Sequence, residues 1–561
     1  MSSTPRISTK NSAWRALAQA TTNRKTGFML VFGFSSGLPF ALFLGTLFAW
    51  LTEAEVDLET MGIFSLIGLA YAFQFLWSPL IDKMNIPVLR KIGKRKQWII
   101  PMQLLLGFIL VAMSSLDPQS YLGMFSLLAG VGAFASATQD IAINAWRIDV
   151  ADEVATIDIL STVYQMGYRL SSLVGGALSL IIAAMIGWPE TYMLMGLLLL
   201  ISALVGLFAP NSKVNIHSEH DDEVRAMRRA GELTPKVRGR ALLSVAFLWS
   251  GSIGIVLAFM VMSMVYSPEN RPNPTQFTMK FGPWIIVATI IVPALIAGWL
   301  FSQKRQGRYL LENDDSTSST WDYVVDHLYR ALLLPLVELV GRMGWSLVLI
   351  LAVVLTYRIC DAIWGTFAYP FYLGELNYSN DEVAFASKFF GVGAIILGLA
   401  VGGLMLTGVG RMTTLFVGGL LAALTHLLYA DLSVGGYYMQ FVSDEIGFTW
   451  MISQIPGIGS ASLAKLTFTI MFENLAIGIA GAAYIAWLSS IVSKRFSAVQ
   501  YALLSSLTLL VGTLGRGALG EMIERQGYYD VFVFTTLIGI AATMLVILEW
   551  FRQSKATSGV K

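Results

Sequence analysis

The sequence predicts an all-α polytopic membrane protein: two six-helix bundles with an inserted two-helix hairpin, fourteen spans in all. Three observations predict this class, namely the composition, the spacing of the apolar runs and the distribution of basic residues. Of 561 residues, 55% are apolar and only 13% are charged, whereas charged residues make up roughly a quarter of soluble domains. So many apolar side chains exceed what a soluble core accommodates. The net charge of +2 argues against a nucleic-acid partner.

Fourteen apolar runs are long enough to cross a membrane, because a spanning helix needs ~20 mostly apolar residues. In chain order they are 27–51, 60–81, 97–116, 121–146, 156–186, 190–209, 241–266, 282–303, 345–373, 382–406, 412–432, 461–491, 498–522 and 528–551.

The Lys and Arg residues orient these spans. With the N-terminus inside, 30 of the 38 basic residues fall in cytoplasmic segments, 3 in external segments and 5 within helices. Arg147 belongs to the first group in this count, as the basic residue of the loop after the fourth span. Cytoplasmic loops of membrane proteins carry an excess of Lys and Arg. The asymmetry therefore predicts that both termini face the cytoplasm.

The polar stretches between the runs divide the chain into seven segments. The first has no apolar core with a cleavage site, so we expect a cytoplasmic tail and not a signal peptide. The second polar linker contains an amphipathic stretch that predicts a helix lying on the inner membrane face. The segments are a tail, a six-helix bundle, a linker, the inserted hairpin, the second linker, another six-helix bundle and a tail, at 1–26, 27–209, 210–240, 241–303, 304–344, 345–551 and 552–561.

The two predicted bundles share sequence patterns. FLGTLFAWLTEAEVDLETMGIFS runs from the first span into the second, and IWGTFAYPFYLGELNYSNDEVAFAS repeats its Gly-Thr, aromatic and acidic features in the second bundle. Gln139-Asp140-Ile-Ala-Ile in the fourth core helix similarly matches Glu473-Asn474-Leu-Ala-Ile in the tenth. Parallel six-helix repeats are the architecture of major facilitator transporters. Asp82-Lys83 followed by Gly93-Lys94-Arg95-Lys96 resembles the acidic-then-basic loop of that superfamily, although plain positive-inside charge is the alternative.

Soluble catalytic and metal-binding motifs are missing from the sequence. The sequence contains no Walker A motif, so we do not expect ATP to be the direct energy source. Its single cysteine, Cys360, cannot form an intramolecular disulfide. The polar run at 217–222 reads as a solvated charge cluster and not as a metal site. We therefore expect no cofactor, with a proton gradient as the driving force.

Charged residues inside apolar helices are the strongest functional signal, because each costs at least ~2.5 kcal/mol unless it is paired or hydrated. Arg358 and Asp361 lie one helical turn apart, and Lys388 on the next helix has a similar predicted depth. Two cations and one acid favour an anionic ligand, although a self-neutralising pair remains the alternative. Trp364 and Tyr369 would add aromatic surface to this site, and Gln139 and Asn474 would add amides.

Asp140 is the leading candidate for proton coupling, and Glu473 is the second, because both are acids at repeat-equivalent positions in apolar helices. A hydrogen-bonded structural acid is the alternative. Arg169 needs a partner, for which Asp140 and Asp149 are the candidates. The remaining residues assigned to helix pairing or gating are Asp82 and Arg516.

Several strings resemble the AmpG-type muropeptide permeases of Gram-negative bacteria: GFSSGLPFAL, FLWSPLID, SATQDIAINAWRIDV, GYRL, FENLAIG and KRFSAVQYALLSSL. The resemblance implies a proton-driven importer of anhydromuropeptides in the bacterial inner membrane, with a part in peptidoglycan recycling and in β-lactamase induction. Asn144 stands where some relatives have an acid, and the inserted hairpin exceeds the shortest members.

Other functions remain open at this point. A permease for a different solute, such as a sugar, peptide or acyl-CoA, would share the scaffold and differ only in ligand contacts. A membrane enzyme or receptor is disfavoured, because the long external loop at 433–460 offers Asp444 and Glu445 without a His, Cys or basic partner. We expect the chain to work as a monomer in the lipid bilayer.

Overall fold

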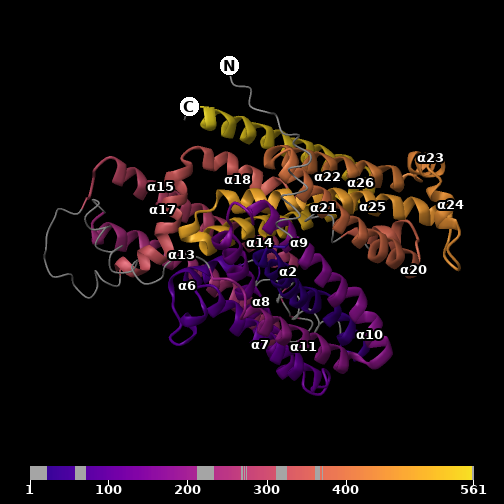
Figure 1. Cartoon of the computed structure of the whole chain (residues 1–561), viewed down its shortest axis with the longest axis horizontal. Helices are drawn as coiled ribbons and strands as arrows, with labels where there is room; N and C mark the ends of the chain where they lie inside the picture. Colours follow the sequence, from indigo (N-terminus) through magenta and orange to yellow (C-terminus); the bar gives the residue numbers. More distant parts are fainter. Residues whose placement is uncertain are drawn as a thin grey trace.

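The computed structural model describes residues 22–56, 71, 73–211, 233–266, 270, 272, 274–310, 325–359, 367–368 and 370–558. These residues form helices and their connections, and the one strand-like contact among them is an isolated bridge between Leu233 and Leu310. The first half of the chain and the second half form two bodies that lie against each other (Figure 1).

The first half contains long helices that cross the body in alternation. Its first span bends through three pieces, and its second span is described only from residue 71 onward. The helices are α2 (Arg24–Ala41), η1 (Leu42–Thr46), α3 (Leu47–Glu53), η2 (Gln74–Leu76), α6 (Ser78–Lys83), η3 (Leu89–Ile92), α7 (Lys96–Ser114), α8 (Leu122–Val150), α9 (Ile157–Ser172), η4 (Leu173–Leu178), α10 (Ser179–Ile186) and α11 (Trp188–Gly206).

The small residues of α2 and α9 bring these two helices into backbone contact. A Cβ added to Gly33 would lie 2.3 Å from the carbonyl oxygen of Tyr164, and one added to Gly37 would lie 2.2 Å from Ser171 Oγ. Helices can approach this closely only where side chains are small. The small-residue spacing of GYRLSSLVGG indicates such a face, and the contacts of Gly167 and Ser171 confirm it.

The second half repeats this construction. Gly398 and Gly478 bring two helices together, because a Cβ on either one would lie within 2.4 Å of a carbonyl oxygen on the other helix. The helices are α18 (Ser346–Thr356), η8 (Pro370–Glu375), α20 (Asn380–Ala384), η9 (Phe385–Gly391), α21 (Val392–Gly408), α22 (Arg411–Ser433), α23 (Tyr437–Glu445), α24 (Phe448–Ser453), α25 (Ala461–Ile491), η10 (Lys494–Phe496) and α26 (Ser497–Ser558).

The last two predicted spans, 498–522 and 528–551, both lie within α26 (Ser497–Ser558), which is broken at one residue. Gly527 separates them with φ 82° and ψ 173°, a left-handed conformation that glycine adopts without steric cost. The chain therefore turns at this residue and forms two helices.

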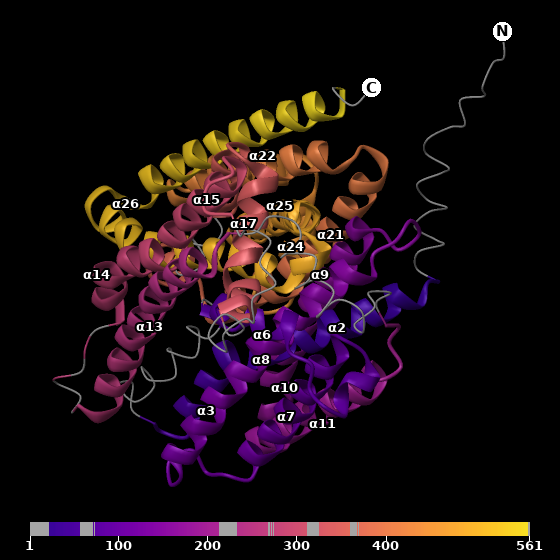
Figure 2. The same ribbon diagram turned by 90° about the vertical axis from the view of Figure 1, so that its left-hand side faces the viewer.

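The helices of the inserted hairpin and of the linker that follows it pack beside the two halves (Figure 2). The hairpin consists of α13 (Pro235–Val265), α14 (Pro274–Ile286), η6 (Val287–Ile291) and α15 (Val292–Arg305). The Trp249 indole N–H donates to the Thr289 carbonyl at 3.0 Å, and Phe259 stacks on Phe277 at 4.0 Å. A bond of 2.5 Å between Arg238 and Asp326 then ties α13 to the linker.

The linker helices η7 (Tyr329–Leu333) and α17 (Leu334–Met343) differ from the prediction of a helix lying on the membrane surface. Tyr329, Leu333 and Leu336 are buried in the protein core. Gln500 in α26 also donates from Nε2 to the Pro335 carbonyl and to Glu338 Oε2, at 2.9 and 2.6 Å. The apolar face of this segment is therefore covered by protein.

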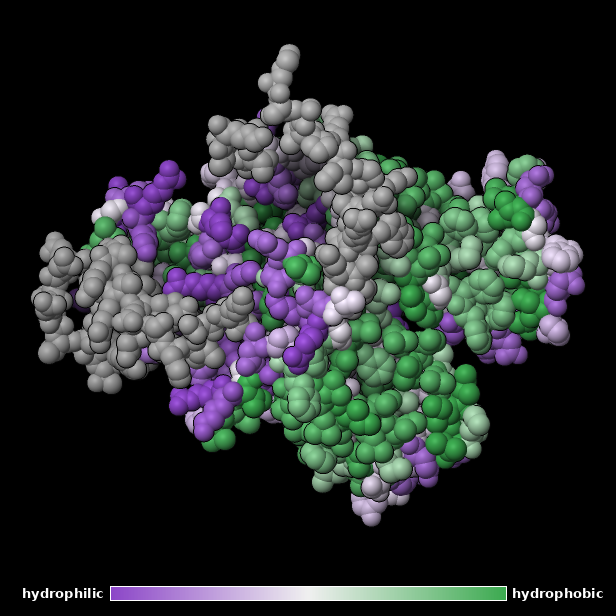
Figure 3. Space-filling view, in the orientation of Figure 1, coloured by the Kyte–Doolittle hydropathy of each residue, from purple (hydrophilic) through white to green (hydrophobic). Residues whose placement is uncertain are grey.

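On the face drawn in Figure 3, apolar side chains cover much of the surface of the helices, as expected for contact with lipid. Exposed side chains along α11 include Met193, Leu197, Ile201 and Leu204. In the described part of the chain, 11 helices are long and apolar enough to cross a membrane, or 12 if the pair Val325–Met343 and Ser346–Thr356, bent by 108°, is one span. The chain is thus a multi-pass membrane protein. The count of fourteen and the seven-segment division stay predictions.

Candidate functional site

The two halves meet along α9 of the first half and α21 and α25 of the second. A Cβ added to Gly403 of α21 would lie 2.7 Å from Thr162 Cγ2, and one added to Gly481 of α25 would lie 3.7 Å from Gln165 Nε2. Polar and ionisable groups of both halves lie along this contact.

Asp140 lies in α8 and is hydrogen-bonded from two neighbouring helices. Its Oδ1 accepts the hydroxyl of Ser36 at 2.6 Å and the hydroxyl of Tyr164 at 2.7 Å. Gln139, which is fully buried, donates to the Ser35 carbonyl at 2.7 Å. Gln139 thus ties α8 to α2 through backbone, while Asp140 presents a half-buried carboxylate beside a cluster of hydroxyl groups.

Arg169 of the first half and Arg358 of the second half both lie near Tyr168. Tyr168, which is half-buried in α9, is within electrostatic range of Asp140, Arg169 and Arg358. The rings of Tyr164 and Tyr168 lie 6.1 Å apart, and Phe40 lies 6.1 Å from Tyr168. The interface thus combines one acid, two cations and a set of aromatic rings.

Asp149 does not serve as the partner of Arg169. It binds Arg95, with a distance of 2.7 Å from Arg95 Nε to Asp149 Oδ2. The reason is depth: Asp149 is next to the last residue of α8, whereas Arg169 lies ~18 Å along α9 from its start at Ile157. Asp140, about ten residues before the end of α8, is at the depth of Arg169.

Glu473 is the acid of the second half. It is 7% exposed in α25 and accepts a hydrogen bond from the Tyr429 hydroxyl of α22. Tyr429 in turn shares a hydrogen bond of 2.8 Å with the Tyr372 hydroxyl of η8. Asn474 donates to the Ile470 carbonyl of its own helix. Asp140 and Glu473 therefore share one chemistry, a buried or half-buried carboxyl group held by a tyrosine hydroxyl.

The other predicted site residues are only partly described. Lys388 is half-buried in η9. Asp361, Trp364 and Tyr369 lie outside the described residues, as does the cluster at 217–222. Arg516 lies within α26, but its side chain is outside the description. In the part of the chain that is described, no group of three or more His, Cys, Asp or Glu residues is placed to hold a metal ion.

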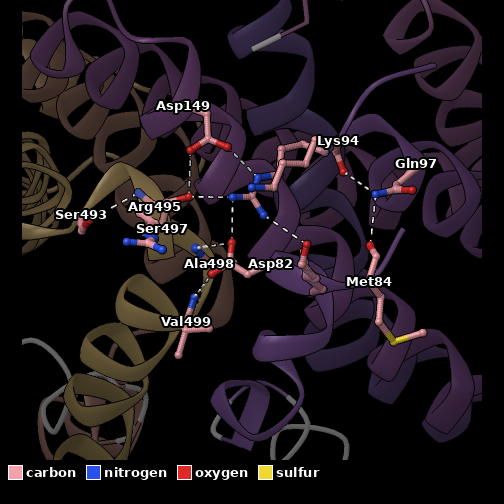
Figure 4. A network of polar contacts seen from close by, with 12 residues as sticks. Asp82, Met84, Lys94, Gln97, Asp149, Ser493, Arg495, Ser497, Ala498 and Val499 are labelled. Atoms are coloured by element: carbon pink, nitrogen blue, oxygen red, sulfur yellow. Dashed lines mark hydrogen bonds and ion pairs between the residues drawn. The ribbon is translucent and has the colours of Figure 1, made fainter. Parts of the chain in front are cut away.

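A buried network joins the two halves at one end of the helices, where the loops 84–95, 151–156 and 493–496 lie. This end, which the basic residues predict to be cytoplasmic, is called the inner face below. Arg95 contacts the carboxylates of Asp82 and Asp149, each at 2.7 Å. Both carboxylates point to the first turn of α26 (Figure 4), where Asp149 accepts the Ser497 hydroxyl at 2.8 Å.

Asp82 binds backbone and not side chains of α26. It accepts the N–H groups of Ala498 and Val499 at 3.4 and 3.0 Å. These groups form the positive end of a helix, where a carboxylate is favoured. Burial disfavours the charged form of Arg95, but the carboxylates of Asp149 and Asp82 outweigh burial and raise the pKa of Arg95 above its usual range.

Further bonds across the halves close the same face. Arg411 at the start of α22 binds Asp158 at 2.8 and 3.2 Å, and Lys494 donates to the Ala151 carbonyl at 3.2 Å. Arg147 of α8 donates to Ser489 Oγ of α25 at 2.9 Å. The halves are therefore sealed together at the inner face in this structure.

Sequence reasoning missed four of these residues. Tyr164, Tyr168 and Tyr429 carry no signal beyond aromatic residues in apolar helices, although the spacing of Tyr164 and Tyr168 by four places them on one face of α9. Arg147 counted as a loop residue, but it lies within α8 and is 0% exposed. Its position three residues before the end of the helix is what made it look like a loop charge.

Comparison with known proteins assigns this chain to a family. Residues 26–312 match the family model of the Major Facilitator Superfamily. The chain is 27% identical to the "Anhydromuropeptide permease" of Escherichia coli K12, over 93% of this chain and 79% of that protein. It is 24% identical to the "Putative transporter AmpG 4" of Rickettsia conorii, over 92% of this chain and 95% of that protein.

A solved structure agrees on the fold. The proton:xylose symporter XylE, bound to 6-bromo-6-deoxy-D-glucose, superposes with a TM-score of 0.50 at 11% identity, covering 95% of each chain. All of these relatives are similar across both halves, which matches the paired bundles described above. This chain is accordingly a member of the major facilitator superfamily, of the AmpG type.

Proposed function

We propose that this protein imports anhydromuropeptides from the periplasm to the cytoplasm by alternating access, coupled to protons, for peptidoglycan recycling. The observation that carries the proposal is the similarity to the anhydromuropeptide permease of E. coli over 93% of this chain. On this proposal the ligand crosses without covalent change, and the protein is not an enzyme. It would act in the bacterial inner membrane with both termini cytoplasmic.

The charges at the interface support an anionic ligand. Arg169 of the first half and Arg358 of the second interact electrostatically with Tyr168, and so does the carboxylate of Asp140. A guanidinium binds carboxylates through charge-assisted hydrogen bonds. Lys388 supplies a further cation in the second half. The peptide carboxylates of a muropeptide would pair with these cations.

The aromatic residues beside them suit the sugar part of the ligand. The Phe40 and Tyr71 rings lie 5.2 Å apart, and Phe40 continues to Tyr168 at 6.1 Å. Such rings offer apolar faces together with hydroxyl groups. One ligand with sugar rings and carboxylates can therefore contact both kinds of group within this interface.

Proton coupling follows from the charge of the ligand. Moving one negative charge into a cell that is negative inside is opposed by ~2.3 kcal/mol per 100 mV, so uptake against a gradient needs a compensating cation. The ionised carboxylate of Asp140 only accepts hydrogen bonds, as it does from Ser36 and Tyr164. A proton placed on Oδ1 would make that oxygen a donor, and Ser36 and Tyr164, which both donate to Oδ1, would then have to rearrange. Glu473 with Tyr429 is the second candidate for this role.

Alternating access requires the sealed inner face to open. The bonds of Asp82, Asp149 and Asp158 to the second half must break together, which would let the ligand leave inward. Both halves belong to one chain, so we propose that a single copy of the chain is enough to carry the ligand across the membrane.

Uptake by proteoliposomes tests this proposal. Vesicles containing the purified protein are given labelled anhydromuropeptide, with an inward proton gradient or without it. We expect accumulation only with the gradient and its loss on adding a protonophore, and empty vesicles serve as the control. Failure to take up or exchange the muropeptide would exclude this substrate. Equal uptake with and without the gradient would exclude proton coupling, while the assignment of anhydromuropeptide as the substrate would stand.

A further inference from the structure

Arg147 is a buried cation with unused hydrogen-bond donors. It is 0% exposed, and it donates one hydrogen bond, from Nη2 to Ser489 Oγ at 2.9 Å. Among the described residues, its Nε and Nη1 have no hydrogen-bond partner. Most buried polar atoms in proteins are paired, so a buried guanidinium with two nitrogens unused needs an explanation.

No carboxylate in the described part of the chain lies within ion-pair distance of Arg147. Arg95, which lies in the same region, has two such partners. The charge of Arg147 is instead held between two rings, with its Cζ 4.8 Å from the centre of Tyr164 and 5.0 Å from that of Tyr501. Cation–π contact offsets part of the cost of burial, but it leaves the N–H groups unsatisfied.

The contacts of Arg147 come from both halves of the molecule. Tyr164 belongs to α9 of the first half, as Arg147 itself belongs to α8, whereas Ser489 and Tyr501 belong to α25 and α26 of the second. When the inner face opens, the second half takes Ser489 and Tyr501 away. The guanidinium then stays with the first half and faces the opening.

The position of Arg147 also connects it to Asp140. The two residues are seven apart on α8, two turns of one helix face. Tyr164 covers the Arg147 guanidinium with its ring and donates from its hydroxyl to Asp140. Arg147 is therefore the next charged side chain of α8 on the way from the level of Asp140 to the inner face.

We propose that Arg147 is an anion-binding residue of the inward-open state, which binds a carboxylate of the departing ligand once Ser489 and Tyr501 have withdrawn. In the closed state the same charge lies buried without an acid partner, and this favours reopening. The inference takes its ligand from the proposed function, but it adds a binding point distinct from Arg358 and Lys388. It also explains why the donors of Arg147 are unused while the inner face is closed.

The test compares the two faces of the membrane. Inside-out and right-side-out vesicles are given anhydromuropeptide with free peptide carboxylates, or the same compound with these carboxylates amidated, and the half-saturation of exchange is measured for each. In the wild type, the inner face should prefer the free acid. In Arg147→Gln this preference should fall about tenfold or more, the scale of a hydrogen bond to a charged group, while the outer face is unchanged.

Two further variants secure the result. Arg147→Lys keeps the charge and should retain part of the preference, so it reports on binding if Arg147→Gln folds poorly. Arg90→Gln removes an exposed cation near the same face and should behave as the wild type. An unchanged inner-face preference in Arg147→Gln, or its full loss in Arg147→Lys and Arg90→Gln alike, would overturn the inference and leave muropeptide transport standing. A wild type that exchanges no muropeptide at either face would overturn both.

Discussion

At the scale of single residues, Asp140 and Glu473 are two acids with matching environments. Each accepts a hydrogen bond from a tyrosine of a neighbouring helix, Tyr164 and Tyr429 respectively. The hydroxyl of a tyrosine can follow a carboxyl group through protonation, because it can either donate or accept. This makes both acids suitable for a proton that arrives and leaves.

Asp140→Asn tests the coupling role. The amide has the shape of the acid and stays uncharged, so we expect proton-driven accumulation to collapse toward equilibrium while ligand exchange across the vesicle membrane continues. Exchange and gradient-driven uptake are measured on the same vesicles. Asp444→Asn, which changes an exposed acid of α23, is the control. Normal accumulation in Asp140→Asn would transfer the coupling role to Glu473.

Arg358→Ala and Lys388→Ala test the ligand cations. We expect each to raise the half-saturation for uptake about tenfold or more, because a charge-assisted hydrogen bond is lost, with normal abundance in the membrane. Arg358→Lys should be affected less, since it keeps the charge. The matched control is Arg525→Ala, an exposed cation outside the interface. Unchanged concentration dependence in both alanine variants would make these residues packing features.

At the scale of elements, the crossing of α2 and α9 sets the position of Asp140, the proposed coupling acid. The carbonyl that lies 2.3 Å from a Cβ on Gly33 belongs to Tyr164, whose hydroxyl holds Asp140. Packing of Gly33 against the backbone of Tyr164 therefore fixes where the hydroxyl group of Tyr164 lies. Gly27 of the same helix has nothing within 4 Å of an added Cβ.

Gly33→Ala should therefore destabilise the protein by ~1–3 kcal/mol through overpacking, and weaken proton coupling by displacing Tyr164. Gly27→Ala should be neutral or stabilise by up to ~1 kcal/mol, as alanine favours helix. Thermal unfolding in detergent measures the first effect and gradient-driven uptake the second. Equal melting temperatures for the two variants would show that α9 moves to make room for the added methyl group without a loss of stability.

Much of the element scale was predictable from the sequence, and the side-chain partners were not. Apolar runs predicted helices such as α22 and α25 closely, because a membrane demands unbroken apolar segments. Asp140 and Arg358 were chosen as candidates because charge in such a segment is rare, and their roles stay predictions. The pairing of Asp149 with Arg95 was missed, since it depends on which helix ends meet in space. Tyr164 was missed because a tyrosine gives the same sequence signal in a core as in a site.

At the scale of the whole molecule, the two halves are joined at the inner face by charges from several loops. Arg95 with its two carboxylates lies at the centre, and Arg411 with Asp158 lies at a second point. Such bonds are strong only while they are shielded from water. Opening therefore exposes and weakens several of them at once, which favours two discrete states.

Asp82→Ala should shift the molecule toward the inward-open state. It removes the acceptor for two backbone N–H groups of α26 and one partner of Arg95. A cysteine at Thr162, buried where α9 meets α21, reports the opening in a Cys360→Ala background. We expect labelling from the inner face to rise several-fold, and Asp117→Ala in the connection after α7 to leave it unchanged. Equal labelling in Asp82→Ala and its parent would assign Asp82 to structure alone.

The topology gives a further prediction. Reporters fused at residues 225 and 320 should lie in the cytoplasm, and a reporter at 272 should lie outside, because 30 of 38 basic residues fall on one side. Enzyme reporters active on only one side of the membrane measure this directly. An external signal at 320 would exclude the inserted hairpin.

The contact of Asp82 with α26 determines where mutations that loosen the inner face can arise. Because Asp82 is bound by the backbone N–H groups of Ala498 and Val499, most replacements of these two side chains leave the hydrogen bonds in place. Mutations that loosen this contact should therefore arise at Asp82 and Arg95 and rarely at 498 or 499. Proline at 499 is the exception, since it lacks the N–H group. Among variants that loosen this one contact, a genetic screen should find most in the first half of the gene.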